Sequence, residues 1–391
     1  MITKLDVDSV RRDLPVTSRV AYLNTGTAGP LPQPAIDAIA EGAREEAEAG
    51  RISHAGWEQL FDRLAALRGG LAALVGADPL EIAISHCTTD GMNIGTLGLD
   101  WKAGDRVVTT TLEHPGALLP LYVIHRRNGV EVEFADIGLG GREETLKAMA
   151  ALIRPGTRLV VLSHVTWGTG AVLPLAEIAE LAHRAGALVL VDGAQSVGCV
   201  PVDMHACGAD FYAFSGQKWL SGPEGTGGVY VRAESLDRFQ PAFVGGFGVD
   251  HEAYRPNDVD AWSPAPGAQR FEVGSVYRPG IHGLNASVEW RRALGEASFA
   301  AIRDLAGYCL ERVGELPGVE LLTPNQEELS GLVAFRLPGL DVTQAVEHLA
   351  SEGVAIRSIP DNQAFRISCG FFNTREEVDR ALSLLSGLAR A

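Results

Sequence analysis

The residues best suited to carry out chemistry are a lysine and an aspartate that each follow a strand-like run. Lys218 lies in "AFSGQKWLSGPEGTGG" (213–228), where an apolar run ends in Ser-Gly and glycines follow. Asp192 comes directly after Val-Leu-Val (189–191), an apolar setting in which a carboxylate needs a partner. Open α/β sheets bind ligands at the carboxyl ends of their strands. In isolation, a surface lysine in a turn and an aspartate at a strand end would be ordinary features.

Two further stretches place polar groups after predicted strands. In "SHCTTDGMN" (85–93), a strand end runs into a helical pattern, whose first N–H groups form an anion site. In "TTLEHPGALLP" (110–120), His114 follows another strand. Pyridoxal phosphate needs a lysine for covalent attachment, a carboxylate that keeps its ring nitrogen protonated, and a cradle for its phosphate. A nucleotide phosphate loop fits less well, because the chain has no GxxxxGK[ST] motif.

The elements that must position these residues alternate along the chain. Helical spacing of apolar residues covers 33–75, and helical patterns such as 174–186 separate most of the later strand-like runs. Such alternation predicts an α/β fold with a mostly parallel sheet that helices cover on both faces. The seven predicted strands are 81–85, 106–110, 131–136, 158–165, 187–194, 210–216 and 227–231.

The character of the sequence changes at 241–282, which is rich in glycine, proline and aromatic residues and has little periodicity. A loop of this length is usually functional. Helical patterns (about 283–315) and strand signals at 331–337 and 364–370 then predict a smaller α/β domain. The predicted division is a segment 1–20 that packs with the small domain, a large domain 21–270, and a small domain 271–391.

Bulk properties exclude several classes of protein. The chain has 391 residues, 46% of them hydrophobic, and its net charge of −16 argues against nucleic-acid binding. The N-terminus lacks the apolar core of a secretory signal and no stretch is long enough to span a bilayer, so we expect a cytoplasmic protein without membrane contact. Five dispersed cysteines without CxxC spacing predict reduced thiols. His205 and Cys207 have no second pair nearby, so no metal site is expected.

Taken together, these motifs resemble a known family. Asp192-x-x-Gln195 followed by Ser215-Gly216-Gln217-Lys218 is similar to the class V aminotransferase and cysteine desulfurase-like group of fold-type I pyridoxal phosphate enzymes. The resemblance runs from "YLNTGTAGPLP" (22–32) to "FRISCGFFNTREEVD" (365–379). It implies that Lys218 carries the cofactor covalently, Asp192 pairs with its ring nitrogen, Gln195 bonds its phenolate oxygen and His114 stacks on its ring.

The same resemblance implies a phosphate site and a dimer. Its phosphate ligands would be Thr89, Asp90 (through its backbone) and Ser215, with Gln217 standing where the family often has a histidine. A neutral amide still donates to phosphate, so an intact site with a changed hydrogen bond is expected. Gly274 and Ser275 in "FEVGSV" (271–276) match a segment that a partner subunit contributes, which implies a homodimer with shared active sites. Thr88 and Ser196 suit either a site role or helix capping.

The reaction is predicted from the C-terminal third of the chain. Arg366 aligns with the family's arginine that binds the α-carboxylate of an amino acid, and Arg357 could hold a second carboxylate or lie on the surface. Desulfurases carry a nucleophilic cysteine in the loop after a segment like "VAIRS" (354–358), but no cysteine stands there before Arg366. Cys369 falls in a predicted strand, where a thiol behaves as a small hydrophobe.

The residue pattern of "VLSHVTWGTGAVLPLAEI" (161–178) most resembles that of the cysteine/cystine C–S lyases. This resemblance implies that Lys218 acts as the general base. The predicted reaction is β-elimination that yields pyruvate, ammonia and sulfide or persulfide. Alternatives are an isopenicillin-N-epimerase-like epimerase, a class V aminotransferase, the disfavoured cysteine desulfurase, and a non-catalytic cofactor-binding protein. The epimerase and aminotransferase outcomes depend on where a proton is placed, which the sequence does not reveal.

Overall fold

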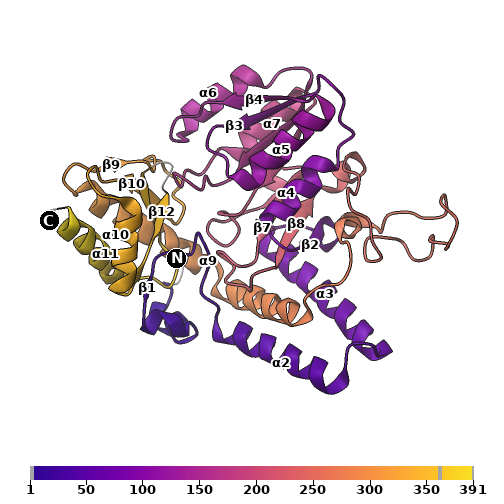
Figure 1. Ribbon diagram of the computed structural model, residues 1–391, viewed down its shortest axis with the longest axis horizontal. Coiled ribbons are helices and arrows are strands. Elements are labelled where there is room, and N and C mark those ends of the chain that lie inside the picture. The colour runs from indigo at the N-terminus through magenta and orange to yellow at the C-terminus, as the bar shows by residue number, and fades with distance from the viewer. Residues whose placement is uncertain (1–3, 360–362, 390–391) are drawn as a thin grey trace.

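The computed structural model describes residues 4–359 and 363–389, and its central feature is a seven-stranded sheet (Figure 1). The strands lie in the order β2-β8-β7-β6-β5-β3-β4. The pairs from β4 to β7 are parallel, whereas β8 is antiparallel to both of its neighbours. The strands are β2 (Ile82–Ser85), β3 (Arg106–Thr110), β4 (Glu131–Ala135), β5 (Thr157–Ser163), β6 (Leu188–Asp192), β7 (Phe211–Ser215) and β8 (Gly227–Val231).

The central strands form because their sequences are apolar on both faces. Every residue of β6 and β7 is buried, which is typical of parallel strands covered by helices on either side. One face packs Val191 and Tyr212 into a core cluster with α3, and the other packs Leu190 and Phe211 against α4 and α5. The mostly parallel seven-stranded sheet predicted from the sequence is therefore confirmed. The helices around it are α3 (His54–Val75), α4 (Thr88–Leu97), α5 (Pro115–Asn128), α6 (Arg142–Leu152), α7 (Leu175–Arg184) and α8 (Met204–Cys207).

A second, antiparallel sheet has the order β12-β13-β10-β9 and lies beside α10 and α11 (Figure 1). Its core includes Phe335, Phe365, Leu349 and Leu382. The beginning of the chain joins this part of the molecule, because β1 pairs in parallel with β11. Its elements are α1 (Val7–Arg12), β1 (Ala21–Tyr22), β9 (Glu320–Leu321), β10 (Leu332–Arg336), α10 (Val342–Ser351), β11 (Val354–Ala355), β12 (Arg357–Ile359), β13 (Ala364–Ser368) and α11 (Arg375–Leu388).

One long helix, α9 (Arg278–Gly314), connects the two sheets. Its first half packs on α2 (Gln33–Ala49) and α3, and its second half contributes to the core of the smaller sheet. The two halves meet at a kink at Gly295, where φ is 56° and ψ is −155°. Close to the kink, the buried guanidinium of Arg291 lies 4.1 Å from the ring centre of Phe371 and donates to the carbonyl of Gly198.

The irregular connection expected over 241–282 occupies 239–277, with one short helical turn, η4 (Gly267–Phe271), whereas 278–282 already belong to α9. Part of this connection, around 250–263, extends away from the rest of the chain at the right of Figure 1. Val259 and Trp262 there are 86% and 43% exposed. Within the described residues, no helix combines the length and apolar character that crossing a membrane requires.

Candidate active site at the carboxyl edge of the large sheet

Asp192 and Lys218 are positioned by adjacent strands. Asp192 is the last residue of β6, is 5% exposed, and accepts a hydrogen bond from the N–H of Ala194 at 2.9 Å. Lys218 lies in the turn that follows β7. Burial lowers the pKa of Lys218 to about 8, and the negative charge of Asp192 opposes that shift. The neutral, nucleophilic form of this amine is therefore accessible near physiological pH.

Gln195 is fixed by two neighbours rather than left free in the site. Its Nε2 donates to the carbonyl of Gly26 at 2.8 Å, and its Oε1 accepts from the indole N–H of Trp219 at 2.9 Å. Trp219 follows Lys218 directly and is fully buried. The amide keeps one N–H for a further acceptor, so the predicted bond to a phenolate oxygen is compatible with this geometry.

The start of α4 is where the sequence predicts an anion site. Ser215 ends β7, and its hydroxyl accepts from the N–H of Thr88 at 3.1 Å and lies 2.6 Å from the hydroxyl of Thr88. The side chain of Asp90 accepts from the N–H of His86 at 3.3 Å and pairs with its ring. Thr89 is exposed at the first turn of the helix. Because the Thr88 N–H is taken by Ser215, the N–H groups of Thr89 and Asp90 are those of this turn that could bind an anion.

Two polar atoms around this edge are buried without a partner among the described residues. They are Oε1 of Gln217, next to Lys218, and Oγ of Ser85, at the end of β2. Buried polar groups are rarely left unpaired in native proteins unless a ligand or water completes them. Together with the depressed pKa of Lys218, the Ser85 hydroxyl and the Gln217 amide, each of which can donate a hydrogen bond, fit a site built for a polar aldehyde cofactor with a phosphate group.

His114 occupies the start of α5. Its Nδ1 accepts a hydrogen bond from the N–H of Gly116 at 3.0 Å, which leaves the ring proton on Nε2. The indole of Trp167 contacts this ring edge-on, with ring centres 5.4 Å apart at 88°. Burial lowers the pKa of His114, so its ring is neutral at pH 7. A neutral, oriented imidazole can stack on an aromatic cofactor.

Arg366 reaches the site from β13. It is 3% exposed, donates from NH1 to the carbonyl of Trp167 at 2.8 Å, and has its NH2 3.4 Å from the hydroxyl of Thr27. Its Nε lacks a partner within the described chain. Burial lowers the pKa of Arg366 to about 10, and the positive charge of Arg357 adds to that shift. Arg357 stands opposite Arg366 on β12 and is itself exposed.

Gly274 and Ser275 differ in how they lie relative to this edge of the sheet in the single chain. Gly274 lines a small hollow together with Ser85 and His86, whereas Ser275 is exposed and has no hydrogen bond in the described structure. One chain therefore does not bring Ser275 into hydrogen-bond contact with the start of α4. The hydroxyl of Ser196 bonds the carbonyl of Gly193 and the hydroxyl of Tyr212, which supports the structural of its two possible roles.

Several residues of this site were missed by the sequence analysis. Gly26 and Trp167 act through their main-chain carbonyls, which leave no trace in the residue type. Glu113 is buried beside His114. In the sequence, only its position directly before His114 could have drawn attention to it. The Cys87 thiol, which precedes α4, lies near enough for its negative form to raise the pKa of Lys218. Among the described residues, no group of three or more potential metal ligands occurs.

Comparisons with known proteins identify the family. The model of class-V aminotransferases matches residues 21–381, so the chain belongs to this pyridoxal phosphate-dependent family. A cysteine desulfurase of Escherichia coli (strain SE11) is 34% identical, with 98% of each chain covered. A probable cysteine desulfurase 2 of Mycobacterium leprae is 30% identical over 100% of this chain and 97% of its own.

Solved structures extend this result. The cystine C–S lyase C-DES, in complex with its reaction product cysteine persulfide, has a TM-score of 0.89 at 32% identity, covering 95% of this chain and 99% of its own. A mutant of C-DES with glycine covalently linked to the cofactor has the same TM-score and identity, covering 96% and 98%. The fold-type I architecture and the pyridoxal phosphate cofactor expected from the sequence are thereby confirmed.

Proposed function

We propose that the protein is a pyridoxal phosphate-dependent C–S lyase that acts on cystine or cysteine. The observation that carries this proposal is the placement of two guanidinium groups, Arg366 and Arg357, beside a buried lysine with a depressed pKa. A buried guanidinium holds an α-carboxylate in one orientation, and a second one suits the distal carboxylate of cystine. Similarity to C-DES, described as a cystine C–S lyase, supports the same reaction class.

Each residue then has a definite task. When bound, pyridoxal phosphate supplies an electron sink for the pair left on Cα after proton removal. Asp192 would keep a proton on the ring nitrogen, and Gln195 would donate its remaining N–H to the phenolate oxygen. Lys218 Nζ takes the Cα proton as a neutral amine, for which a pKa of about 8 is suitable.

The leaving group decides the outcome. The Cβ–S bond breaks, and its electron pair departs with sulfur as a persulfide from cystine or as hydrosulfide from cysteine. A persulfide is the more acidic species and so the better leaving group. The remaining three-carbon product, 2-aminoacrylate, hydrolyses to pyruvate and ammonia, and Arg366 releases the carboxylate.

A cysteine desulfurase remains the principal alternative because several relatives bear that name. That reaction would need a nucleophilic cysteine. Cys369 is fully buried, and its contact with the Cys309 thiol, together with burial, raises the pKa of Cys369 well above the usual range. A neutral buried thiol is a poor nucleophile. Cys87 is the half-buried exception close to Lys218. The burial of Cys369 favours the lyase, and the position of Cys87 makes that residue the control in the experiment below.

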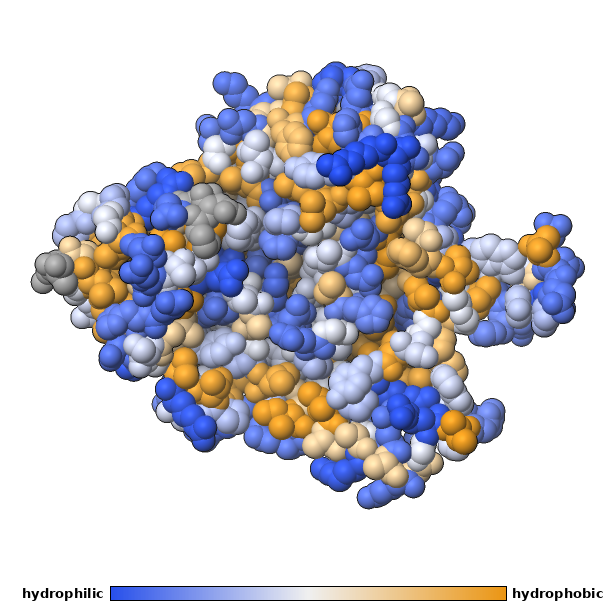
Figure 2. Space-filling model, in the orientation of Figure 1, coloured by the Kyte–Doolittle hydropathy of each residue, from blue (hydrophilic) through white to orange (hydrophobic). Residues whose placement is uncertain are grey.

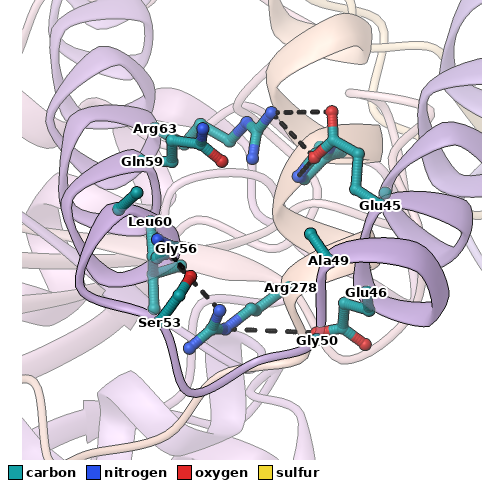
Figure 3. A pocket seen from close by; sticks show the side chains of 13 residues that line it. Glu45, Glu46, Ala49, Gly50, Ser53, Gly56, Gln59, Leu60, Arg63 and Arg278 are labelled. Carbon is teal, nitrogen blue, oxygen red and sulfur yellow. Dashed lines mark hydrogen bonds and ion pairs between the residues drawn. The ribbon is translucent and has the colours of Figure 1, made fainter.

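A homodimer that shares its active sites would complete the phosphate site. The segment around Ser275 is anchored on both sides: the carboxylate of Glu272 binds Arg68 at 2.6 Å, and Arg278 lies 4.8 Å from the ring centre of Trp57. Figure 3 shows Arg278 also reaching Gly56 and Glu46 in the hollow between α2, α3 and α9. An exposed serine on an anchored segment suits a residue donated to a neighbouring subunit.

Apolar surface around this segment supports the same assembly. Figure 2 shows hydrophobic side chains gathered at the base of the projecting connection. The exposed large hydrophobic residues of this region include Trp57, Phe61, Phe243, Val244, Val273 and Tyr277. Contiguous apolar surface of this kind marks an interface in a water-soluble chain.

The experiment that tests the proposed function is an assay of purified protein with cystine, cysteine and alanine. We expect pyruvate to accumulate in step with cystine consumed, without any keto-acid acceptor. Racemisation without pyruvate would instead establish an epimerase, and dependence on an added keto acid would establish an aminotransferase. Cys369→Ala and Cys87→Ala should keep pyruvate release within about threefold of wild type, since neither thiol carries sulfur in the lyase. Alanine formation that Cys87→Ala abolishes would establish a desulfurase.

A further inference from the structure

Glu113 is a buried carboxyl group that the proposed mechanism does not use. It lies in the turn between β3 and α5 and is 5% exposed. Its two oxygens accept hydrogen bonds from the hydroxyls of Thr110 and Ser163, each at 2.6 Å. No cation pairs with Glu113 within the described residues. Burying a carboxyl group without a cation costs free energy. A neutral residue would therefore be favoured here if the side chain had only to close the turn.

The two hydroxyls tie Glu113 to the edge of the sheet that carries the site. Thr110 ends β3, and Ser163 ends β5, where it pairs in register with Asp192 of β6. The carboxyl group thus connects the turn to two neighbouring strands at the level of Asp192. The charge of Asp192 and, to a larger degree, burial raise the pKa of Glu113 to about 7, in keeping with this position.

The residue that follows Glu113 in the turn is His114. The backbone of His114 is extended, with φ −73° and ψ 148°, and its ring is held on one side by the N–H of Gly116 and on another by the indole of Trp167. Neither contact fixes where the turn itself sits on the sheet. The two bonds of the Glu113 carboxyl group do so, because they attach the preceding residue to β3 and β5.

We propose that Glu113 is the positioning residue for His114, because it anchors the β3–α5 turn to the ends of β3 and β5 and thereby sets the plane of the imidazole against the bound cofactor. The proposal rests on the pyridoxal phosphate site described above and not on the identity of the substrate. Glu113 itself contacts neither cofactor nor substrate. Its effect on the reaction passes through the orientation of one ring.

The test uses the circular dichroism of the bound cofactor, which reports its asymmetric contacts without any turnover. In Glu113→Ala at equal cofactor occupancy, the visible ellipticity should fall to about half or less, and kcat by about 10- to 100-fold, as expected for a misplaced group. The KM for cystine should stay within about threefold, because Arg366 is untouched. Glu113→Gln should recover most of both signals, since an amide of the same size can bond both hydroxyls.

Glu81 supplies a matched control. It is also 5% exposed, and its carboxylate accepts from the N–H groups of Asp78 and Ala233 and pairs with His205 before β2, at the opposite edge of the sheet. Glu81→Ala should lower the thermal midpoint as much as Glu113→Ala does but leave the visible ellipticity at the wild-type value. Equal ellipticity in wild type and Glu113→Ala, or no recovery in Glu113→Gln, would overturn the proposal.

A double mutant shows whether the effect passes through His114. Adding Glu113→Ala to His114→Ala should change the visible ellipticity and kcat by less than about twofold, because the ring to be positioned is gone. A full additive loss would refute the proposed route. If Glu113→Ala does not fold, Ser163→Ala removes one of the two hydrogen bonds with little change of volume, and an ellipticity between those of wild type and His114→Ala is then the expected result. Failure of pyruvate release in wild type would refute the lyase but leave this spectroscopic test intact.

Discussion

At the scale of single residues, the chemistry depends on burial that moves pKa values toward neutrality. Lys218 and Glu113 are both surrounded by protein. Burial lowers the pKa of Lys218 to about 8 and raises the pKa of Glu113 to about 7. Asp192 opposes the shift of the lysine and reinforces that of the glutamic acid. The negative charge of Asp192 therefore raises both pKa values, that of Lys218 toward its ordinary value and that of Glu113 away from it.

The first prediction concerns the reactivity of Lys218. In the cofactor-free protein, the rate of covalent attachment of pyridoxal phosphate should rise about tenfold per pH unit up to pH 8 and then level off, because only the neutral amine attacks an aldehyde. Borohydride trapping and mass spectrometry of the modified peptide would measure it. Lys218→Ala should trap nothing while its far-ultraviolet spectrum stays unchanged. A rate that keeps climbing to pH 10 would show that Lys218 is an ordinary lysine.

The second prediction concerns stability. Between pH 4.5 and about 7, the folded cofactor-free protein keeps a proton on Glu113 that the unfolded chain has lost, so the free energy of unfolding should decrease as pH rises. A shift from 4.5 to about 7 corresponds to a loss on the order of 3 kcal/mol relative to Glu113→Gln. Urea unfolding of both proteins at several pH values would measure the difference. Parallel curves would exclude a raised pKa at this position.

At the scale of elements, the site is divided between two sheets. Strands β6 and β7 deliver the cofactor residues, and β12 and β13 deliver the guanidinium groups. Trp167 is where these contributions meet: its carbonyl holds Arg366, its ring contacts His114, and its side chain packs on the cluster with Ile359 and Ala364. Trp167 thus links the smaller sheet to the ring of His114.

The third prediction tests the division of labour between the two arginines. Arg357→Ala should raise the KM for cystine about tenfold and that for cysteine much less, because only cystine carries a distal carboxylate for a charge-assisted hydrogen bond. Arg336→Ala, on β10 of the same sheet and paired with Glu320, is the control and should affect neither substrate. Initial rates of pyruvate release would measure both. Equal losses for cystine and cysteine would mean that Arg357 has only a structural role.

Much of this arrangement could be predicted from the sequence, for physical reasons. Most strands of the large sheet read as short apolar runs rich in β-branched residues, so all seven were placed within two residues of their observed ends. Lys218, Asp192 and His114 follow such runs and were brought together by the topology. The carbonyl of Gly26 and that of Trp167 could not be foreseen, because main-chain acceptors look alike in every residue and acquire a role only when distant segments meet. Glu113 was overlooked because its hydroxyl partners come from two different strands.

At the scale of the whole molecule, the proposed dimer makes each active site a joint product of two chains. Mixing Lys218→Ala with Ser275→Asp should restore activity that neither variant has alone, because the heterodimer contains one site with both native residues. Random reassociation places half of all chains in heterodimers with one good site each, so about a quarter of wild-type activity is expected. Sedimentation would confirm reassociation. Reassociated chains without recovered activity would show that Ser275 does not serve the partner's site.

The pairing of β1 with β11 also determines when the protein can become functional during its own synthesis. Residues 21–26 leave the ribosome long before their partners at 354–355 and Ser368 are made. Domains otherwise fold as the chain grows, from the N-terminus onward. The carbonyl of Gly26, on which Gln195 depends, is therefore locked in place last. A nascent chain can complete the large sheet early, but it acquires a finished cofactor pocket only after Ser368 has been made.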